Sequence, residues 1–465
     1  MADPKKIGIF TLVTINLAAL GGIRSWAPIA ECGFSAVFFL ILAMICFFIP
    51  LALIAAELST KWTGAGGVYV WVKEAFGHKF GFLAAWLLWI ENVMWYPTIL
   101  SFIGGTISYA LNPDLASNPI YNVVLILTIF WTTTLINLFG SRASNWLSRL
   151  GALFGTFIPS TFIIALGIIW IFNDHPLQIE INWGSLIPNL NNPDQIALLS
   201  GVMLSMLGIE MSAIHANDVE NPQKNYPKAI LYSFLAVILF STLGVLSIAF
   251  VVPKNELLVN AGCLQAFSYF LNTYHLSFIL PFVGLFIGLG ALGSMSTWMV
   301  AASKAFVAAG REENLPPVLI KLNKHHVPKN LLLIQAVIVS VLSFIFLLMP
   351  TVNSAYWILM VLTTQLYLLM YLLLFSAAIK LRIKHPEKKS GFTIPGGSPA
   401  FWALGLLGFF SSAFAFFICF IPPKQIHAGS KAAYVAFLVL AVTFFTLLPI
   451  LFLRRKRMVA IPNTS

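Results

Sequence analysis

Runs of apolar residues separated by short polar segments make up most of the chain. A helix needs about 20 apolar residues to cross the hydrocarbon core of a bilayer, and runs of that length recur along the whole sequence. The alternation of apolar and polar positions that marks the strands of a membrane barrel is not found, so the runs are predicted to be helices. We predict twelve spans, at residues 8–31, 34–57, 80–110, 120–139, 146–172, 195–216, 228–252, 276–307, 330–349, 353–380, 399–421 and 432–453.

The composition agrees with this pattern. Hydrophobic residues make up 59% of the 465 residues and charged residues 9%, whereas a soluble domain averages about 45–50% and about 25%. These values exclude a soluble globular enzyme and a disordered chain. The predicted fold class is therefore an all-α polytopic membrane protein, with residues 1–465 forming a single transmembrane domain.

The basic residues indicate how the chain lies in the membrane. Lys and Arg outnumber Asp and Glu by 27 to 16, which gives a net charge of +11. With the N-terminus inside, 23 of the 27 basic residues fall in predicted cytoplasmic segments, as the positive-inside rule requires. We therefore predict an integral multi-pass protein with both termini in the cytoplasm. The charge then needs no nucleic-acid partner, and membrane lipid is the expected surrounding.

Three charged residues are predicted near the middle of spans, where each costs about 2.5–3.5 kcal/mol on insertion scales. They are Arg24, Glu91 and Glu210. A charge kept in the membrane at that cost points to a functional site. Glu31 and Glu57 lie nearer the ends of spans, where water is expected to reach them, and we interpret both as structural.

Arg24 follows a pair of glycines in the first span. Gly21 and Gly22 weaken the helix by about 1 kcal/mol each, and Pro28 removes a further backbone hydrogen bond. Backbone groups freed in mid-membrane are tolerated where they line a cavity, so they are candidates for binding the carboxylate and ammonium of a ligand. The alternative is a proline kink in which Arg24 pairs with a neighbouring carboxylate.

The sixth span also carries a glycine and an acid, Gly208 and Glu210. Interruptions at corresponding positions of two halves point to the binding site of a transporter, so spans 1 and 6 are predicted to share one site. His215, five residues after Glu210, is either a pH sensor, because histidine titrates near physiological pH, or a solvated polar residue near a helix end.

The third span contributes Glu91 to the same region. Asn92 follows it directly, and Trp95 lies four residues further on, on the same helical face. A carboxylate with an amide and an aromatic ring nearby suits a cationic or amide group. The alternative is an internal ion pair between Glu91 and Arg24, which a substrate would compete with.

Hydroxyl groups on the eighth span are the last candidates. Ser294, Ser296 and Thr297 either line a cavity or bind an ion, or they bond to carbonyls of their own helix. The sequence holds no HExxH, no GxSxG and no cluster of metal-ligand residues, and its four cysteines lie far apart. We therefore predict no enzymatic activity, no metal and no cofactor.

Several segments taken together resemble a known family of membrane proteins. Each is weak alone, but their order is specific and they cover nearly the whole chain. The segments are 55–60 (AAELST), 66–72 (GGVYVWV), 208–217 (GIEMSAIHAN), 220–222 (ENP), 225–227 (NYP), 296–300 (STWMV), 314–316 (NLP) and 392–397 (FTIPGG). In this order they are similar to the glutamate/GABA antiporter branch of the amino acid–polyamine–organocation permeases.

The resemblance implies a LeuT-like fold with two inverted five-helix repeats, at about 8–172 and 195–380, followed by helices 11 and 12 at about 399–453. It implies a substrate held by broken helices 1 and 6, with helices 3 and 8 completing the pocket. Carried over residue by residue, it assigns proton coupling or gating to Glu210, and substrate contacts to Gly21, Gly22, Ile23, Tyr96, Leu204, Gly208 and Trp298.

Together these inferences predict a secondary active amino acid antiporter of a bacterial inner membrane, working by alternating access. Arg24, Glu91 and Ser294 are predicted to set the side-chain preference: Arg24 favours a carboxylate, and Glu91 leaves a cationic amino acid open. The expected partners are an amino acid substrate and a counter-substrate amino acid or amine. Two alternatives stay open, a proton- or Na⁺-coupled symporter and a membrane sensor that binds an amino acid without moving it.

Overall fold

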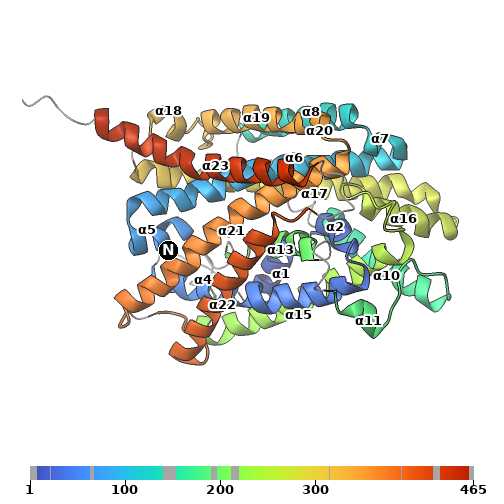
Figure 1. Cartoon of the computed structure of the whole chain (residues 1–465), viewed down its shortest axis with the longest axis horizontal. Helices are drawn as coiled ribbons and strands as arrows, with labels where there is room; N and C mark the ends of the chain where they lie inside the picture. The colour runs from blue at the N-terminus through green and yellow to red at the C-terminus, as the bar shows by residue number, and fades with distance from the viewer. Residues whose placement is uncertain are drawn as a thin grey trace, which may run out of the picture.

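The structure, a computed structural model, is built of helices (Figure 1). It describes residues 8–20, 22–62, 67–139, 153–189, 196–210, 219–313, 315–388, 390–422 and 430–459. Within these residues, nine helical stretches are long and apolar enough to cross a membrane, and each coincides with a predicted span. They are Gly33–Lys61, Pro119–Asn137, Phe154–Phe172, Pro222–Val251, Ser277–Glu312, Lys329–Leu348, Val352–Lys384, Gly397–Ile418 and Lys431–Pro449.

The other three predicted spans have distinct structures. Span 3 is one continuous helix of 34 residues, α6 (His78–Leu111), which is about 50 Å long at 1.5 Å per residue. Span 1 is divided into α1 (Ile9–Leu20) and α2 (Trp26–Ala30), with the 3₁₀ turn η1 (Ile23–Ser25) before α2. The described part of span 6, residues 196–210, contains the short helix α13 (Leu199–Ser205), which ends before Glu210.

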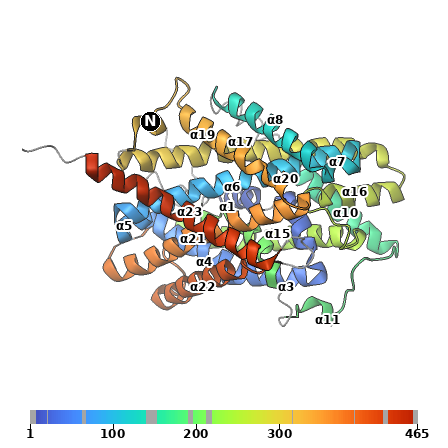
Figure 2. The same cartoon turned by 45° about the horizontal axis from the view of Figure 1, so that its top comes forward.

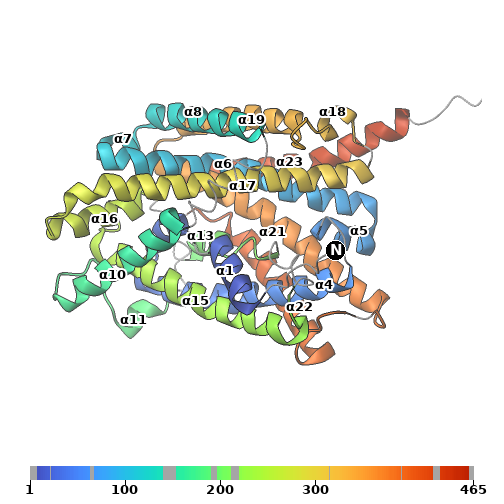
Figure 3. The ribbon, with the colours of Figure 1, turned by 180° about the vertical axis from the view of Figure 1, so that it is seen from behind.

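Three long helices form the centre of the molecule. The helix α6 packs along both α17 (Leu280–Glu312) and α21 (Val352–Lys384), and the three run through the middle of the bundle (Figure 3). Both α6 and α21 are apolar around most of their circumference and are buried over most of their length. A helix that is apolar on all sides belongs inside a protein rather than at its surface.

Other long helices cover this centre on two sides (Figures 1 and 2). On one side, α8 (Pro119–Asn137) packs with α19 (Lys329–Ser343) against α6. On the other side, α15 (Pro222–Val251) contacts α1, and α22 (Gly397–Ile418) contacts α4, the last part of span 2. The exposed residues of these outer helices are largely Ile, Leu, Val and Phe, which suits contact with lipid.

Shorter elements complete the chain. In span 2, η2 continues into α3, and the π-helix η3 then joins α3 to α4. A second π-helix, η4, continues into α10. Their bounds and those of the remaining helices are η2 Gly33–Ser35, α3 Ala36–Ala43, η3 Met44–Phe48, α4 Ile49–Lys61, α7 Pro113–Ser117, η4 Leu153–Phe157, α10 Ile158–Phe172, α11 Trp183–Leu186, α16 Gly262–Thr273, η6 Ser277–Ile279, α18 Pro317–Ile320, α20 Ile345–Leu348 and α23 Lys431–Val459.

A short helix outside the spans, α5 (Val68–Phe76), fastens the beginning of α6 to the end of α17. The Tyr69 hydroxyl donates to Glu312 Oε2 at 3.0 Å and to Glu313 Oε1 at 3.1 Å. Lys73 Nζ forms an ion pair with Glu312 Oε2 at 2.5 Å. Burial, with the two carboxylates adding to it, raises the pKa of Tyr69. The phenol therefore stays protonated and keeps donating.

Candidate functional site

The first of two interruptions lies between α1 and α2. The helix α1 ends at Leu20, and Gly22 takes an extended conformation with φ −64° and ψ 116° before the turn η1 begins. Gly21 lies outside the described residues. The helix breaks next to a glycine because glycine is a poor helix former, so little free energy is lost when it takes another conformation. The Gly22 carbonyl accepts from the Ser25 N–H at 3.0 Å and from the Ser25 hydroxyl at 2.8 Å, so the turn η1 takes over from the helical ladder at this point.

The second interruption follows α13. Gly208 has φ +105°, a conformation that side-chain-bearing residues rarely adopt. Its N–H donates to the Tyr371 hydroxyl on α21 at 2.9 Å instead of to a carbonyl of its own helix. A Cβ at Gly208 would lie 3.7 Å from the Trp298 ring, so the backbone passes close to α17. His215, predicted to act near this break, lies outside the described residues.

A cavity with about 390 Å³ of space between atoms lies beside the two interruptions. Side chains from spans 1, 3, 6 and 8 line it, and span 10 adds two more. The lining residues are Arg24 before α2, Glu91, Asn92 and Trp95 on α6, Leu204 on α13, Leu207 and Gly208 after α13, Trp298 on α17, and Thr363 and Tyr367 on α21.

The two charged residues on the cavity wall are not paired with each other. The Arg24 guanidinium lies over the Trp95 ring, 4.7 Å from its centroid, in a cation–π contact. The Glu91 Oε1 accepts a hydrogen bond from the Asn92 amide. Both residues lie in the described part of the chain, and no ion pair joins them. The internal Arg24–Glu91 pair considered from the sequence is therefore wrong, because each group has a different neighbour.

Glu210 is 1% exposed, and its two oxygens are both used within the protein. Tyr367 donates to Oε1 at 2.7 Å and Tyr371 donates to Oε2 at 2.5 Å. The two phenol rings stack with centroids 4.8 Å apart. Glu210 therefore ties the interrupted span 6 to α21, and it reaches the cavity only through Tyr367.

The sequence reasoning missed the contribution of span 10. Thr363, Tyr367 and Tyr371 recur every four residues, so they lie on one face of α21. A row of hydroxyl side chains on one face of an otherwise apolar span could have predicted this contribution. Thr363 and Tyr367 line the cavity, while Tyr371 holds the backbone of Gly208 and the carboxyl group of Glu210.

Some of the predicted site residues lie away from the cavity wall. Ile23 is 3% exposed and belongs to the apolar core. Tyr96 is fully buried and packs on Phe130, with ring centroids 5.2 Å apart. Ser294 is half-buried on α17 and is not among the lining residues. Gly22 is next to the site, since a Cβ there would lie 3.6 Å from the side chain of Arg24.

The other hydroxyls predicted on span 8 are engaged elsewhere. Ser296 Oγ donates to Asn137 Oδ1 of α8 at 3.0 Å. Thr297 Oγ1 donates to the Gly293 carbonyl of its own helix at 3.1 Å. Thr297 therefore bonds to its own helix backbone, which was one of the two interpretations offered from the sequence.

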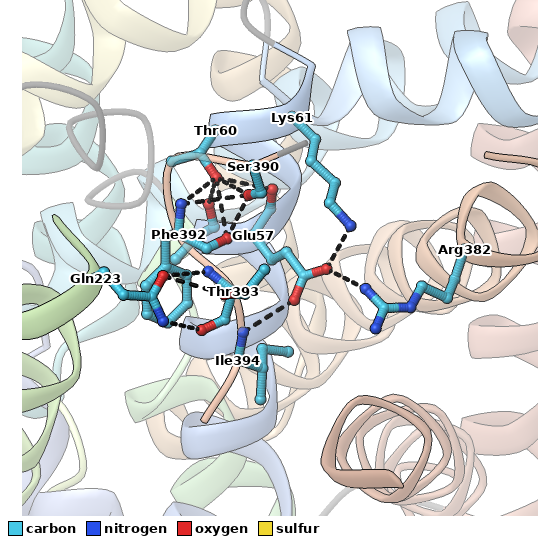
Figure 4. Close-up of polar contacts among 10 residues, drawn as sticks. Glu57, Thr60, Lys61, Gln223, Arg382, Ser390, Phe392, Thr393 and Ile394 are labelled. Atoms are coloured by element: carbon cyan, nitrogen blue, oxygen red, sulfur yellow. Dashed lines mark hydrogen bonds and ion pairs between the residues drawn. The ribbon is translucent and has the colours of Figure 1, made fainter. Parts of the chain in front are cut away.

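A second buried polar cluster lies apart from the cavity and centres on Glu57 (Figure 4). Glu57 is 2% exposed. Its Oε1 accepts from Lys61 Nζ and from Arg382 Nη1, each at 2.7 Å, and its Oε2 accepts from the Ile394 N–H at 3.1 Å. Glu31 is also buried, at 3% exposure. The expectation that water reaches these two acids is therefore wrong for both, because neighbouring segments cover them.

The Glu57 cluster holds the connector between α21 and α22 against two other elements. Ser390 and Thr60 share a hydrogen bond of 2.6 Å. Gln223, on α15, donates to the Thr393 carbonyl and accepts from the Thr393 N–H, both at 2.8 Å (Figure 4). Phe392 between them is fully buried. Residues 390–394 are thus fixed to α4 and α15 by polar contacts on both sides.

Comparison with known proteins adds a further line of evidence. A family model described as amino acid permease matches residues 7–444. An uncharacterized transporter of Legionella pneumophila is 40% identical over 453 residues, which cover 97% of each chain. The glutamate/gamma-aminobutyrate antiporter of Lactococcus lactis is 30% identical over 453 residues, covering 96% of this chain and 90% of that one. The cadaverine/lysine antiporter of Escherichia coli is 26% identical over 378 residues, covering 76% and 77%.

Proposed function

Because the chain belongs to the amino acid permease family, we propose that it is a secondary active amino acid antiporter. It exchanges an amino acid for a second amino acid or an amine across the inner membrane of a bacterium, by alternating access. The single observation that carries the proposal is the cavity beside the interruptions of spans 1 and 6. The names of the Lactococcus and Escherichia relatives, which both describe antiporters, support exchange over uniport.

The proposed topology has twelve spans and both termini in the cytoplasm. Spans 1–5 at about 8–172 and spans 6–10 at about 195–380 form two inverted LeuT-like repeats, and spans 11 and 12 follow at about 399–453. The interruptions at Gly22 and Gly208, in the first span of each repeat, support this arrangement. The excess of basic residues in the segments proposed to be cytoplasmic supports the orientation.

In the proposed mechanism, backbone groups at the two interruptions bind the α-carboxylate and the α-ammonium of the substrate. Unwound backbone in a membrane protein is stable where it lines such a cavity, and helix termini suit ionic groups. Arg24, Glu91, Leu204 and Trp298 contact the side chain of the substrate. Glu210 couples protonation to gating, because its two tyrosine contacts connect span 6 to α21.

Counterflow in proteoliposomes tests the proposal. Purified protein is reconstituted into liposomes loaded with one unlabelled amino acid or its decarboxylation amine, and uptake of the labelled compound from outside is followed. We expect uptake that depends on the internal load and is absent in empty liposomes. Binding without flux for every amino acid and amine would instead indicate a sensor, and uptake into empty liposomes driven by H⁺ or Na⁺ would indicate a symporter.

A further inference from the structure

The wall of the cavity presents one cation and one carboxyl group to whatever enters. Within the described residues, several fully buried polar atoms lack a hydrogen-bond partner. The guanidinium nitrogens of Arg24 and the second oxygen of Glu91 do not belong to that set. Since they form no hydrogen bond or ion pair within the described residues either, they reach the cavity that both side chains line. Glu210 offers no such group, because both of its oxygens accept from tyrosines.

The neighbours of Arg24 and Glu91 keep the two groups apart. The Trp95 ring holds the guanidinium from one side, and Asn92 holds the Glu91 carboxyl group through Oε1. A polar group left without a partner in a low-dielectric site is costly, and a like charge placed beside it adds repulsion. The ligand that fits best therefore satisfies both groups at once.

Carboxylate, ammonium, apolar and carboxamide side chains differ in how well they satisfy Arg24 and Glu91. A carboxylate accepts from Arg24 but has no proton to give Glu91 and is repelled by it. An ammonium donates to Glu91 but meets the positive charge of Arg24. An apolar side chain leaves both without a partner. A carboxamide carries an acceptor oxygen and two N–H donors on one uncharged group, so it bonds to Arg24 and Glu91 together.

We propose that this pocket selects amino acids with a carboxamide side chain, of the size found in asparagine and glutamine. The inference rests on the proposed function, in which backbone groups hold the α-carboxylate and ammonium and leave Arg24 and Glu91 to the side chain.

The first test is homo-exchange by the unmodified protein. Liposomes are loaded with glutamine, asparagine, glutamate, lysine or leucine, and uptake of the same labelled compound is measured below saturation. We expect glutamine or asparagine to exchange at least about tenfold faster than the other three, as a site built around hydrogen bonds discriminates. Faster exchange of glutamate, lysine or leucine overturns the carboxamide proposal and leaves the antiporter standing. Exchange of none of the five also overturns the carboxamide proposal, and counterflow with the remaining amino acids and amines then decides whether the protein is an antiporter.

The second test removes each charge in turn. Arg24→Gln leaves Glu91 alone and is expected to raise the rate for lysine relative to glutamine by about tenfold. Glu91→Gln leaves Arg24 alone and is expected to raise glutamate relative to glutamine by a similar factor. Arg311→Gln and Glu74→Gln, at exposed positions on α17 and α5, are matched controls and keep the original order. Equal loss of all substrates in both variants indicates a structural role and overturns the proposal.

Discussion

Gly208 carries the conformation that opens span 6. With φ at +105°, an alanine there is strained by about 1–2 kcal/mol, although its Cβ would meet the Trp298 ring at an ordinary 3.7 Å. We expect Gly208→Ala to lower the apparent melting temperature modestly and to slow exchange more than about tenfold, because the strain is relieved by moving the backbone that binds substrate.

The control for this prediction is Gly405→Ala on α22. A Cβ at Gly405 would lie 3.6 Å from a side-chain carbon of Ile379, which is ordinary contact, and the backbone there is helical. We expect that variant to exchange at the original rate. Equal effects of Gly208→Ala and Gly405→Ala would remove the special role assigned to the interruption.

Tyr371 is expected to matter more to stability than Tyr367. Its hydroxyl donates to Glu210 and accepts from the Gly208 N–H, whereas Tyr367 bonds only to Glu210. Each buried group left unsatisfied costs about 1–3 kcal/mol, so Tyr371→Phe should lower the melting temperature in detergent further than Tyr367→Phe. Tyr232→Phe, at an exposed position on α15, should leave it unchanged. The opposite order would contradict the assigned contacts.

At the scale of elements, α21 links two distant polar groups. The same unbroken helix carries Tyr367 at the cavity and Arg382 in the Glu57 cluster. Fifteen residues separate them, or about 22 Å along the axis. The connector after α21 is therefore attached to the same helix that lines the cavity.

Replacing the acid at the centre of the Glu57 cluster is expected to loosen that connector. Removing one partner of a buried ion pair typically costs about 3–5 kcal/mol, and Glu57→Gln leaves Lys61 and Arg382 without their carboxylate. We expect trypsin to cut after Lys388 at least about tenfold faster, corresponding to about 1.4 kcal/mol of lost local stability. Mass spectrometry of the fragments measures this. Glu74→Gln on α5 is the control, and an unchanged cleavage rate would contradict the predicted anchoring.

At the scale of the whole molecule, the sequence predicted what depends on local pattern. Apolar runs predicted every span that the structure describes, because burial in lipid needs only length and hydropathy. Gly22 and Gly208 predicted the interruptions, because glycine acts through its own backbone. Apart from Lys61, which lies one helical turn after Glu57, the side-chain partners of Glu57 and Glu210 could not be predicted in this way. They come from Arg382, Tyr367 and Tyr371, more than a hundred residues further along the chain, and only the packing of α21 brings them near.

The orientation in the membrane can be tested through α15. This helix runs unbroken for 30 residues, about 45 Å, so Lys224 near its beginning and Lys254 just beyond its end must lie on opposite sides of the bilayer. The helix α17 then crosses back, which returns Lys324 to the side of Lys224.

In a variant with the four native cysteines replaced by serine, Lys254→Cys should react with an impermeant maleimide in right-side-out vesicles. Lys224→Cys and Lys324→Cys should react only after the membrane is opened. Labelling of Lys224→Cys alone in sealed vesicles would invert the topology, and equal labelling of Lys224→Cys and Lys254→Cys would mean that α15 does not span the bilayer. The expected pattern follows from the basic residues, because the segments around Lys224 and Lys324 belong to the strongly basic set while that around Lys254 does not.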